Sequence, residues 1–399
     1  MKKRALSLLM ALVMVISLLP ATARAADSTL NGDISVGTAA NLAALGGKDI
    51  VGNITLTADI DMSNTEMTPI KSLKGCFNGD SKTISRLTLK GGSGSSKYDS
   101  EAGEYVTTYV NTGLIGELDG SAINLKMTDV SITGIGSYNN VGTLVGYIAD
   151  GSTSKIDNCY VSGTITSTTS SSAYIGGLAG YMSGSINEHT ALTINNSVSN
   201  VSLKGARSNY VGGLLGTAQS FSDVTITKCA VLGDLSGNGN SSGVIGYINS
   251  ASTALTLSDS YLGGKVDGSK KYGVAYNLSV LSSLSCTNFY YDNEKNKSAS
   301  SWSSFDMFNK GSADAEGKTT DDLKSLTLDG FAVRDGEFGG YPVPKWTPAA
   351  APDPVTPEPS FSCALTFTGT EGGTLIVYGP KGNVVPANGD GSYTLSSAG

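Results

Sequence analysis

The sequence is poor in charged residues, and in basic ones above all. Only 15% of its 399 residues are charged, and 27 Lys and Arg face 34 Asp and Glu, which gives a net charge of −7 at pH 7. Proteins that bind nucleic acid or anionic membranes use clustered positive charge. The sequence therefore predicts no nucleic acid partner and no anionic membrane partner.

Histidine is nearly absent, since His189 is the single one in the chain. A Ser-His-Asp triad, a two-histidine zinc site and histidine-based acid–base catalysis all lack the residues they need. His189 itself stands in a polar loop and is interpreted as a solvated side chain. We expect no catalytic residue, no metal site and no cofactor.

Cysteine is scarce and scattered. Five cysteines, an odd number far apart in the sequence, do not form the pattern of a disulfide framework. Cys159 and Cys229 share one repeat position two coils apart, too far to bond across the coil between them. Buried thiols are therefore favoured over disulfides for Cys76, Cys159, Cys229, Cys286 and Cys363.

Long apolar runs are missing except near the N-terminus. Three basic residues, Lys2, Lys3 and Arg4, precede an apolar stretch at residues 5–19 and an Ala-Arg-Ala cleavage pattern at residues 23–25. This order is typical of a signal peptide, and the stretch is short for a membrane span of about 20 residues. Residues 1–25 are predicted to be a signal peptide, and the mature chain to be secreted without membrane insertion.

Glycine, in contrast, is abundant, and it brackets an apolar motif that returns six times at steps of 30 to 36 residues, the period of a solenoid. One copy begins with Thr143, and the last ends in Tyr276, so an irregular coil is expected there. The copies are Gly113-Leu114-Ile115-Gly116, Thr143-Leu144-Val145-Gly146, Gly177-Leu178-Ala179-Gly180, Gly213-Leu214-Leu215-Gly216, Gly243-Val244-Ile245-Gly246 and Gly273-Val274-Ala275-Tyr276.

A second segment follows each motif by about a dozen residues, as at residues 156–161 and 226–231. It is rich in β-branched residues and Tyr, is bounded by turn residues and lacks helical periodicity, so it is predicted to be a strand. One such unit cannot bury enough apolar surface to offset the entropy of ordering it. We therefore predict an all-β fold, a single-stranded parallel β-helix with stacked equivalent strands.

The glycine motif itself is predicted to form a corner. Val211 and Leu214 are three apart and cannot both face inward on a flat strand of period two. Glycine would permit the corner by adopting positive φ and by letting the backbones of neighbouring coils approach. Stacking would then place the second motif residues in one column: Leu144, Leu178, Leu214 and Val244.

The repeat resembles the GLUG-motif family of bacterial secreted and surface proteins, which carry phrases like Val211-Gly212-Gly213-Leu214-Leu215-Gly216 followed by an Ile-x-Asn-Cys-like strand. The resemblance extends over residues 33–346. It implies a pectate-lyase-like solenoid with an N-terminal cap and opening coils at residues 26–110, repeats at 111–290 and a C-terminal cap at 291–346. Some members are metallopeptidases, but no His-Glu-x-x-His sequence is present here.

The ends of the solenoid carry helix signals. Thr38 is an N-cap residue before good helix formers and Gly46, which predicts a short helix covering the first coil. Thr319 has capping-box spacing and is expected to start another short helix.

Proline gathers after Trp346. Residues 347–360 are predicted to be an extended Pro-rich linker. Residues 361–399 alternate like strands and resemble the opening of an immunoglobulin-like or carboxypeptidase-regulatory-like β-sandwich. We expect downstream domains of a longer chain, and attachment to the cell surface through sequence beyond residue 399.

Tyrosines flank the glycine motifs and are the candidate contacts to a glycan or to a host or cell-surface protein. Facing outward, they would form ladders of rings able to pack on sugar faces or on a protein. Facing inward, they would be ordinary core columns, which is the preferred interpretation. The candidates are Tyr138, Tyr174 and Tyr210 before the motif, and Tyr147, Tyr181 and Tyr247 after it, with Tyr272 also preceding one copy.

Two other features are candidate sites. Asp59 and Asp61 form the best local carboxylate pair, but a role in a turn or cap is preferred to a catalytic or calcium-binding one. The excursion at residues 91–109 breaks the regular coils, as functional loops often do. No acidic or basic cluster in register across adjacent coils is recognised.

These features together predict a secreted or cell-surface adhesin-like binding module or stalk without catalytic activity. Two alternatives stay open. One is a β-helical carbohydrate-active enzyme, a lyase or hydrolase, on fold analogy alone. The other is the non-catalytic stalk of a longer surface enzyme such as a metallopeptidase.

Overall fold

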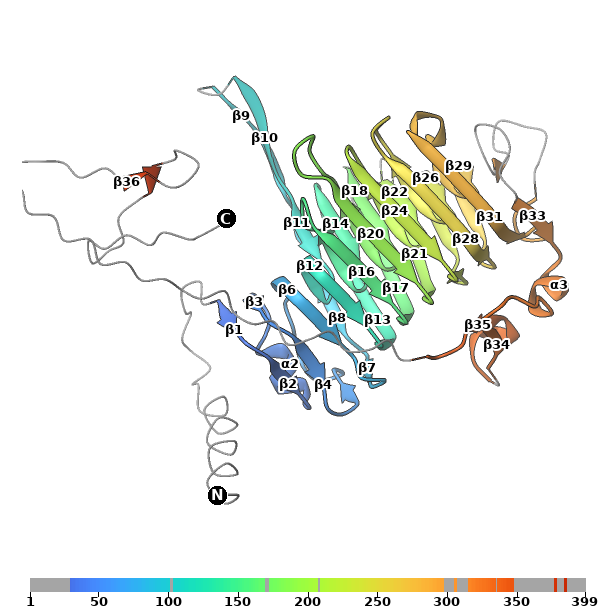
Figure 1. The fold of residues 1–399 in the computed structure, drawn as a ribbon, viewed down its shortest axis with the longest axis horizontal. Coiled ribbons are helices and arrows are strands. Elements are labelled where there is room, and N and C mark those ends of the chain that lie inside the picture. The colour runs from blue at the N-terminus through green and yellow to red at the C-terminus, as the bar shows by residue number, and fades with distance from the viewer. Residues whose placement is uncertain are drawn as a thin grey trace, which may run out of the picture. The chain divides into compact units, whose positions relative to one another are not determined.

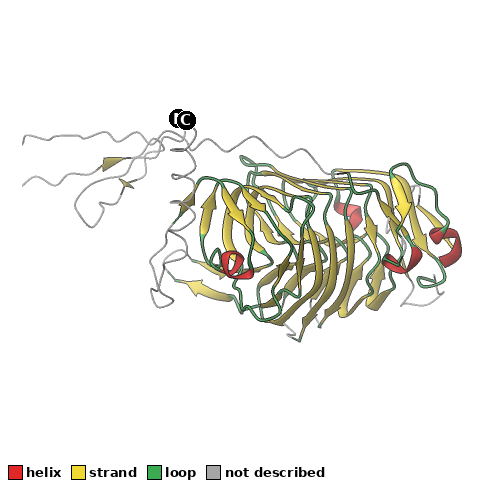
Figure 2. Ribbon diagram, turned by 90° about the horizontal axis from the view of Figure 1, so that it is seen from below, coloured by secondary structure: helices red, strands yellow, loops and turns green. Residues whose placement is uncertain are grey.

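The computed structural model describes residues 29–347, apart from residues 101–102, 169–171, 207–208, 298–304, 307–314 and 335, and two short backbone segments further on. The chain divides into two units, residues 1–354 and 355–399. In the first unit, strands of successive coils pair in parallel with their equivalents in the next coil (Figure 1). This unit is a parallel β-helix, as predicted, and strands make up most of it (Figure 2).

Four parallel ladders run along the solenoid, named A to D in the order in which a coil passes through them. Ladder A contains β11 (Val110–Thr112), β14 (Asn139–Gly142), β18 (Ala173–Gly176), β22 (Asn209–Gly212) and β32 (Phe305–Asp306). Ladder B contains β1 (Leu30–Asn31), β3 (Asp49–Val51), β15 (Val145–Ile148), β19 (Ala179–Met182), β23 (Leu215–Ala218), β27 (Ile245–Ile248) and β30 (Ala275–Tyr276).

Ladder C contains β2 (Ile34–Val36), β4 (Ile54–Leu56), β16 (Thr153–Asp157), β20 (Thr190–Asn195) and β24 (Ser222–Thr227). Ladder D contains β5 (Ile60–Asp61), β7 (Thr83–Ser85), β8 (Thr88–Lys90), β13 (Lys126–Ile135), β17 (Tyr160–Ser167), β21 (Val198–Gly205), β25 (Ala230–Val231) and β33 (Ala315–Lys318). Longer strands pass from one ladder to the next: β6 (Ile70–Asn78) and β12 (Ile115–Ile123) from B to C, β28 (Ala254–Leu262) and β31 (Ser283–Asp292) from C to D, and β26 (Leu235–Ser242) and β29 (Val266–Tyr272) from D to A.

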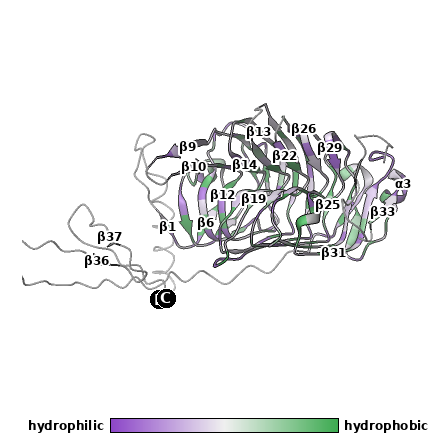
Figure 3. Cartoon of the chain, turned by 90° about the horizontal axis from the view of Figure 1, so that it is seen from above, coloured by the Kyte–Doolittle hydropathy of each residue, from purple (hydrophilic) through white to green (hydrophobic). Residues whose placement is uncertain are grey.

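Like residues stack in the interior. Leu144, Leu178, Leu214 and Val244 are buried, and the backbone N–H of each of the first three donates to the carbonyl of the next at 2.9 to 3.1 Å. The predicted single column is confirmed. Along the strands, hydrophobic and hydrophilic residues alternate, as the colours of Figure 3 show, because one face of each strand meets the interior.

The glycine motif forms the corner between ladders A and B, as predicted, but the expected positive φ is wrong. None of Gly113, Gly177, Gly213 and Gly243 lies in the left-handed region. Close approach alone requires them, since a Cβ on Gly213 would lie 2.1 Å from the carbonyl oxygen of Gly243. Thr143 replaces glycine in one coil, stays buried, and donates its hydroxyl to the carbonyl of Gly177.

Left-handed residues occur instead at the turn between ladders C and D, where Asn and Asp tolerate this conformation. Amides stack there from coil to coil: Asn158 Nδ2 donates to Asn124 Oδ1 at 2.9 Å, and Asn124 Nδ2 to Asn78 Oδ1 at 3.2 Å. The turn residues with φ of 45 to 55° are Asn124, Asn158, Asn196, Lys228, Asp259 and Asn288.

Cysteines and serines alternate in the column directly after this turn. Cys159 and Cys229 are buried thiols, as expected, and burial raises the pKa of each to about 12. Their backbone N–H groups donate to the hydroxyls of Ser197 and Ser260, at 3.2 and 3.0 Å. Cys363 lies outside the described residues.

Both predicted short helices are present. In α2 (Ala39–Ala43), the Thr38 hydroxyl accepts from the Asn41 N–H at 3.2 Å, and Leu42 packs into the core of the first coils. In α3 (Thr320–Lys324), the Thr319 hydroxyl accepts from the Asp322 N–H at 3.1 Å.

The chain after α3 turns back along ladder D, and we call residues 326–346 the strap (Figure 1). It contains β34 (Phe331–Val333), the 3₁₀ turn Phe338–Gly340 and β35 (Pro342–Pro344). Its side chains cover the outer face of ladder D and end at Trp346, whose Nε1–H donates to Ser81 Oγ at 2.9 Å. The apolar cluster that joins strap, α3 and ladder consists of Tyr160, Val198, Ala230, Tyr261, Leu323, Leu328, Phe331, Tyr341 and Val343.

The predicted signal peptide at residues 1–25 lies outside the described residues. So do the linker after residue 347 and nearly all of the domain predicted at residues 361–399, of which β36 (Val377–Tyr378) and β37 (Val384–Val385) form one antiparallel pair. Among the described helices, none combines the length and the apolar character that crossing a membrane requires.

Candidate functional site

The candidate tyrosines lie on the two ladders that flank the glycine corner. Tyr174 and Tyr210 are register partners in ladder A. In ladder B, Tyr147 pairs with Tyr181, and Tyr247 follows two coils on. Tyr138 precedes β14 and stands outside both columns, with a φ of 51°.

The preferred interpretation of these tyrosines as core columns is wrong. Tyr174 lies between Ala173 and Ile175, both fully buried in the core, so its ring points to the opposite, outer face. All six candidates are half-buried. They form a surface feature that the hydrophobic core does not include.

The rings contact one another across both ladders. Tyr174 and Tyr181 meet across the glycine corner with ring centroids 5.1 Å apart, and Tyr210 stacks on Tyr247 at 4.4 Å. We call the continuous set the tyrosine strip. Its members are Tyr109, Tyr138, Tyr147, Tyr174, Tyr181, Tyr210, Tyr247, Tyr272 and Tyr276.

The stacking decides what the strip can offer a ligand. Tyr174, Tyr210 and Tyr247 lie nearly parallel, with interplanar angles of 13 and 16° between neighbours, so each covers the face of the next. In the middle of the strip, the ring faces are therefore covered by neighbouring rings and are not free to pack on a sugar, contrary to expectation. Burial raises the pKa values of the hydroxyls of Tyr174 and Tyr181, which stay neutral hydrogen-bonding groups.

Two members of the strip, Tyr276 and Tyr109, were not predicted from the sequence as part of it. Tyr276 was interpreted as a degraded glycine position, but a register shift pairs it with Tyr247, so its ring continues the ladder B column. Tyr109 belongs to the excursion at residues 91–109, and its ring contacts Tyr174 and Tyr181.

The excursion is an antiparallel hairpin of β9 (Ser95–Asp99) and β10 (Glu104–Thr108) that projects from the coils (Figure 1). Tyr98 and Tyr105 are direct cross-strand partners with ring centroids 5.2 Å apart, and are 59 and 72% exposed. Of the six strongly exposed large hydrophobic side chains in the described chain, four belong to this excursion: Tyr98, Tyr105, Val106 and Tyr109. The exposed aromatic faces are therefore here.

An acidic cluster, which the sequence analysis did not recognise, lies where the strip meets the first coils. Asp49, Ser72, Glu117 and Tyr147 occupy one register column on four successive coils of ladder B. The pKa of Glu117 is raised, chiefly by burial of its side chain. The negative charges of Asp150, Asp49 and Asp119 raise it further. Ser72 separates the two acidic residues of this column, and Lys71 Nζ lies 2.8 Å from Asp49 Oδ2, so the column does not place acidic residues in register on adjacent coils.

The carboxylate pair weighed in the sequence has structural partners. Asp61 forms an ion pair with Arg86, which lowers the pKa of the carboxyl group to about 2. Asp59 Oδ1 accepts from the backbone N–H of Thr83 at 2.8 Å. His189 is half-exposed and lies 3.2 Å from Asp223, as a solvated loop residue would.

Within the described ranges, no three His, Cys, Asp or Glu side chains are grouped so as to hold an ion. The prediction that the chain has no metal site concerns the undescribed residues as well and stays a prediction.

No family model and no curated protein matches the chain. Among solved structures it is similar to the crystal structure of a candidate immunoglobulin A1 protease from Bacteroides ovatus. The TM-score is 0.55 and the sequence identity 18%, over 78% of this chain and 92% of that one. At this identity the likeness concerns the fold alone, and it supports the β-helix.

Proposed function

We propose that the chain is a secreted or cell-surface binding module that uses the β9–β10 hairpin and the adjoining tyrosine strip to hold a glycan. The observation that carries the proposal is the exposure of Tyr98 and Tyr105, side by side on a hairpin that leaves the coils. Exposed aromatic faces next to hydroxyl groups suit the alternating apolar and polar faces of sugars. The resemblance to the GLUG-motif family of surface proteins agrees with this role.

The two surfaces have complementary parts in the proposal. The hairpin supplies ring faces, whereas the stacked strip supplies ring edges and hydroxyls such as that of Tyr247, which donates to Asn249 Oδ1 at 2.7 Å. Tyr109, the member of the strip nearest the hairpin in sequence, follows β10 directly and contacts Tyr174 and Tyr181. The paired coils hold the rings of the strip in place, which lowers the entropic cost of binding there.

The test compares the full chain with the double variant Tyr98→Ser/Tyr105→Ser on immobilised mucin, plant polysaccharides and a glycan array. Binding should be lost in the double variant and kept in Ile186→Ser, which removes an equally exposed apolar side chain outside the hairpin. Equal binding by all three proteins would contradict the proposal. Binding that survives enzymatic removal of the glycans would reassign the partner to a protein.

A carbohydrate-active enzyme is the second candidate, because the acidic cluster lies beside Tyr147 at one end of the strip. The same polysaccharides, incubated with the chain and analysed for released reducing sugar or unsaturated uronate, test this candidate. Release that is lost in Glu117→Gln would favour the enzyme over the binding module.

The third candidate, a stalk of a longer surface enzyme, takes support from the protease description of the Bacteroides ovatus neighbour. It predicts neither binding nor turnover by this chain. Failure of both assays above would favour it.

A further inference from the structure

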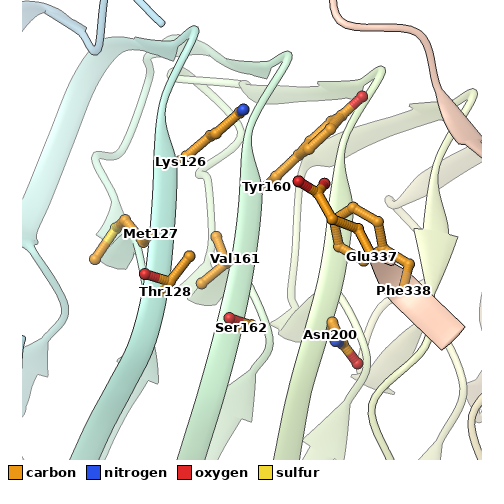
Figure 4. Close-up of a pocket in the computed structure, with 9 residues that line it drawn as sticks. All are labelled: Lys126, Met127, Thr128, Tyr160, Val161, Ser162, Asn200, Glu337 and Phe338. Carbon is orange, nitrogen blue, oxygen red and sulfur yellow. The ribbon is translucent and has the colours of Figure 1, made fainter. Parts of the chain in front are cut away.

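A pocket lies between the strap and ladder D, away from the hairpin and the strip. It has a volume of about 250 Å³ and is walled by Tyr160 of ladder D and by Phe338 and Glu337 of the strap (Figure 4). The Tyr160 and Phe338 rings meet edge to face, with centroids 5.8 Å apart. The pocket is therefore an apolar, aromatic recess with one polar side.

The polar side comes from three successive coils. Thr128 of β13, Ser162 of β17 and Asn200 of β21 line the pocket, and Ser162 and Asn200 are register partners. In the described structure their side chains have no hydrogen-bond partner. Neighbouring coils repeat at about 4.8 Å, so two hydroxyls and an amide stand in a row along the wall.

The wall contributed by the strap is held in a strained conformation. Phe338 has a φ of 51°, where a bulky side chain is a genuine outlier. Such strain is found where the surrounding structure enforces it, often at ligand sites. Here it places the Phe338 ring against Tyr160, opposite the row of polar groups.

The charges at the pocket argue for a neutral ligand. Arg334 Nη1 lies 3.3 Å from Glu337 Oε2 and its guanidinium covers the outer Tyr160 ring at 4.8 Å, while Lys126 Nζ lies 5.0 Å from the Trp346 ring. Arg334 and Glu337 thus balance each other's charge, and Lys126 is engaged by the Trp346 ring, so no unpaired carboxylate or free cation is directed at a ligand. Figure 4 shows the Lys126 amine pointing away from Ser162 and Asn200.

We propose that this pocket binds a single neutral glycosyl unit, with its apolar face on the half-buried Phe338 ring and its hydroxyls on Thr128, Ser162 and Asn200. The volume is below the range of pockets for drug-sized ligands, about 300–1,000 Å³, and suits one small ring. The site does not depend on the hairpin or on the function proposed for it.

The test is saturation-transfer NMR of the full chain with the methyl glycosides of glucose, galactose, mannose and N-acetylglucosamine. At least one glycoside should receive saturation, and Ser162→Trp, which fills the pocket, should abolish the transfer. Phe338→Gly should abolish it too, because glycine adopts this φ without strain but removes the ring wall. Tyr98→Ser/Tyr105→Ser should keep the transfer, which separates this site from the hairpin.

No transfer to any of the four glycosides would overturn the proposal, as would transfer that survives in Ser162→Trp. Limited proteolysis shows whether Phe338→Gly still holds its strap. If that strap is released, Ser162→Trp decides alone, since its substitution lies on the ladder.

Discussion

At the scale of single residues, the interior columns of the solenoid leave no room for a charge. Leu214 stands in the middle of the corner column, 1% exposed, between Leu178 and Val244. Leu214→Asp would bury a carboxylate without a partner, which costs about 3–5 kcal/mol. We expect the melting temperature to fall by roughly 10 °C.

The matched control for this change is Ser202→Asp, which places the same charge on an exposed position of β21. Its effect should stay within about 0.5 kcal/mol, as for ordinary surface substitutions. Calorimetry on both variants checks the prediction, and equal melting temperatures would refute the stacked column.

Glu117 makes the stability of the fold depend on pH. Its pKa is raised in the folded chain by burial and then by Asp150, so ionising it opposes folding. This cost is absent below the unfolded pKa of about 4.3, grows as pH rises through the folded pKa, and is complete above it. Glu117→Gln should therefore melt about 1–2 °C higher than the unmodified chain at pH 7.5, a small figure because the side chain is half-exposed, with the gap closing near pH 4.

Asp61 is the control for Glu117, because its pKa is shifted in the opposite direction. Hydrogen bonds from Arg86 lower the pKa of Asp61 to about 2, so its charge favours folding above its unfolded pKa and the benefit is lost as pH falls through the folded value. Asp61→Asn should lower the melting temperature at pH 7.5. The same sign of shift in both variants would contradict the electrostatic account.

At the scale of elements, the strap is a long segment held to the coils by side chains along its length. The Trp346 ring meets Tyr160 edge-on at 4.9 Å, and its N–H donates to Ser81. At the near end, the buried Asp292 carboxylate accepts from the Thr320 hydroxyl at 2.7 Å and from the Tyr341 hydroxyl at 3.3 Å. Between these contacts, the hydroxyls of Tyr160 and Tyr261 donate to the carbonyls of Pro344 and Pro342.

Trp346→Ala should free the far end while the coils stay folded. We expect faster hydrogen exchange and new protease cleavage within the strap, with a fall of only a few degrees in the melting temperature, since the ladder hydrogen bonds remain. Lys345→Ala, next to it with an exposed side chain, should change neither. Unchanged exchange in Trp346→Ala would show that the Trp346 contacts do not hold the strap.

The elements also show which features the sequence could predict. The corner column and the buried position shared by Cys159 and Cys229 follow from periodicity, because each coil repeats one pattern, whereas both helices follow from their capping residues. The left-handed turn at Asn124, Asn158 and Asn196 was visible as a recurrent Asn or Asp, but glycine was assigned that conformation instead. Glycine at the corner answers a different need, the contact between the backbones of neighbouring coils.

Features without periodicity escaped prediction for a physical reason. The hairpin adds residues 91–109 between β8 and β11, so Ser72 and Glu117 are 45 residues apart although they are register neighbours, and the acidic cluster could not be recognised by spacing. The strap returns along ladder D through contacts of Trp346 and Tyr341 with residues far away in sequence. Whether the tyrosine side chains face inward or outward depends on which face of each strand packs against the core, and the repeat pattern alone does not determine this.

At the scale of the whole molecule, continuous stacking of the coils is the source of stability that the described residues show. The core runs from Val36 in the first coil to Phe289 in the last as one buried cluster, and the described part of the chain holds no group of side chains suited to a metal. An ion present at a hundred times its dissociation constant would add about 2.7 kcal/mol, or roughly 5–10 °C of melting temperature. We therefore expect EDTA to leave the melting temperature of the full chain unchanged, with added calcium as the reverse control. A fall of several degrees that calcium restores would show that an ion is bound, and Asp49→Asn and Asp59→Asn would then tell which of these two carboxylates holds it.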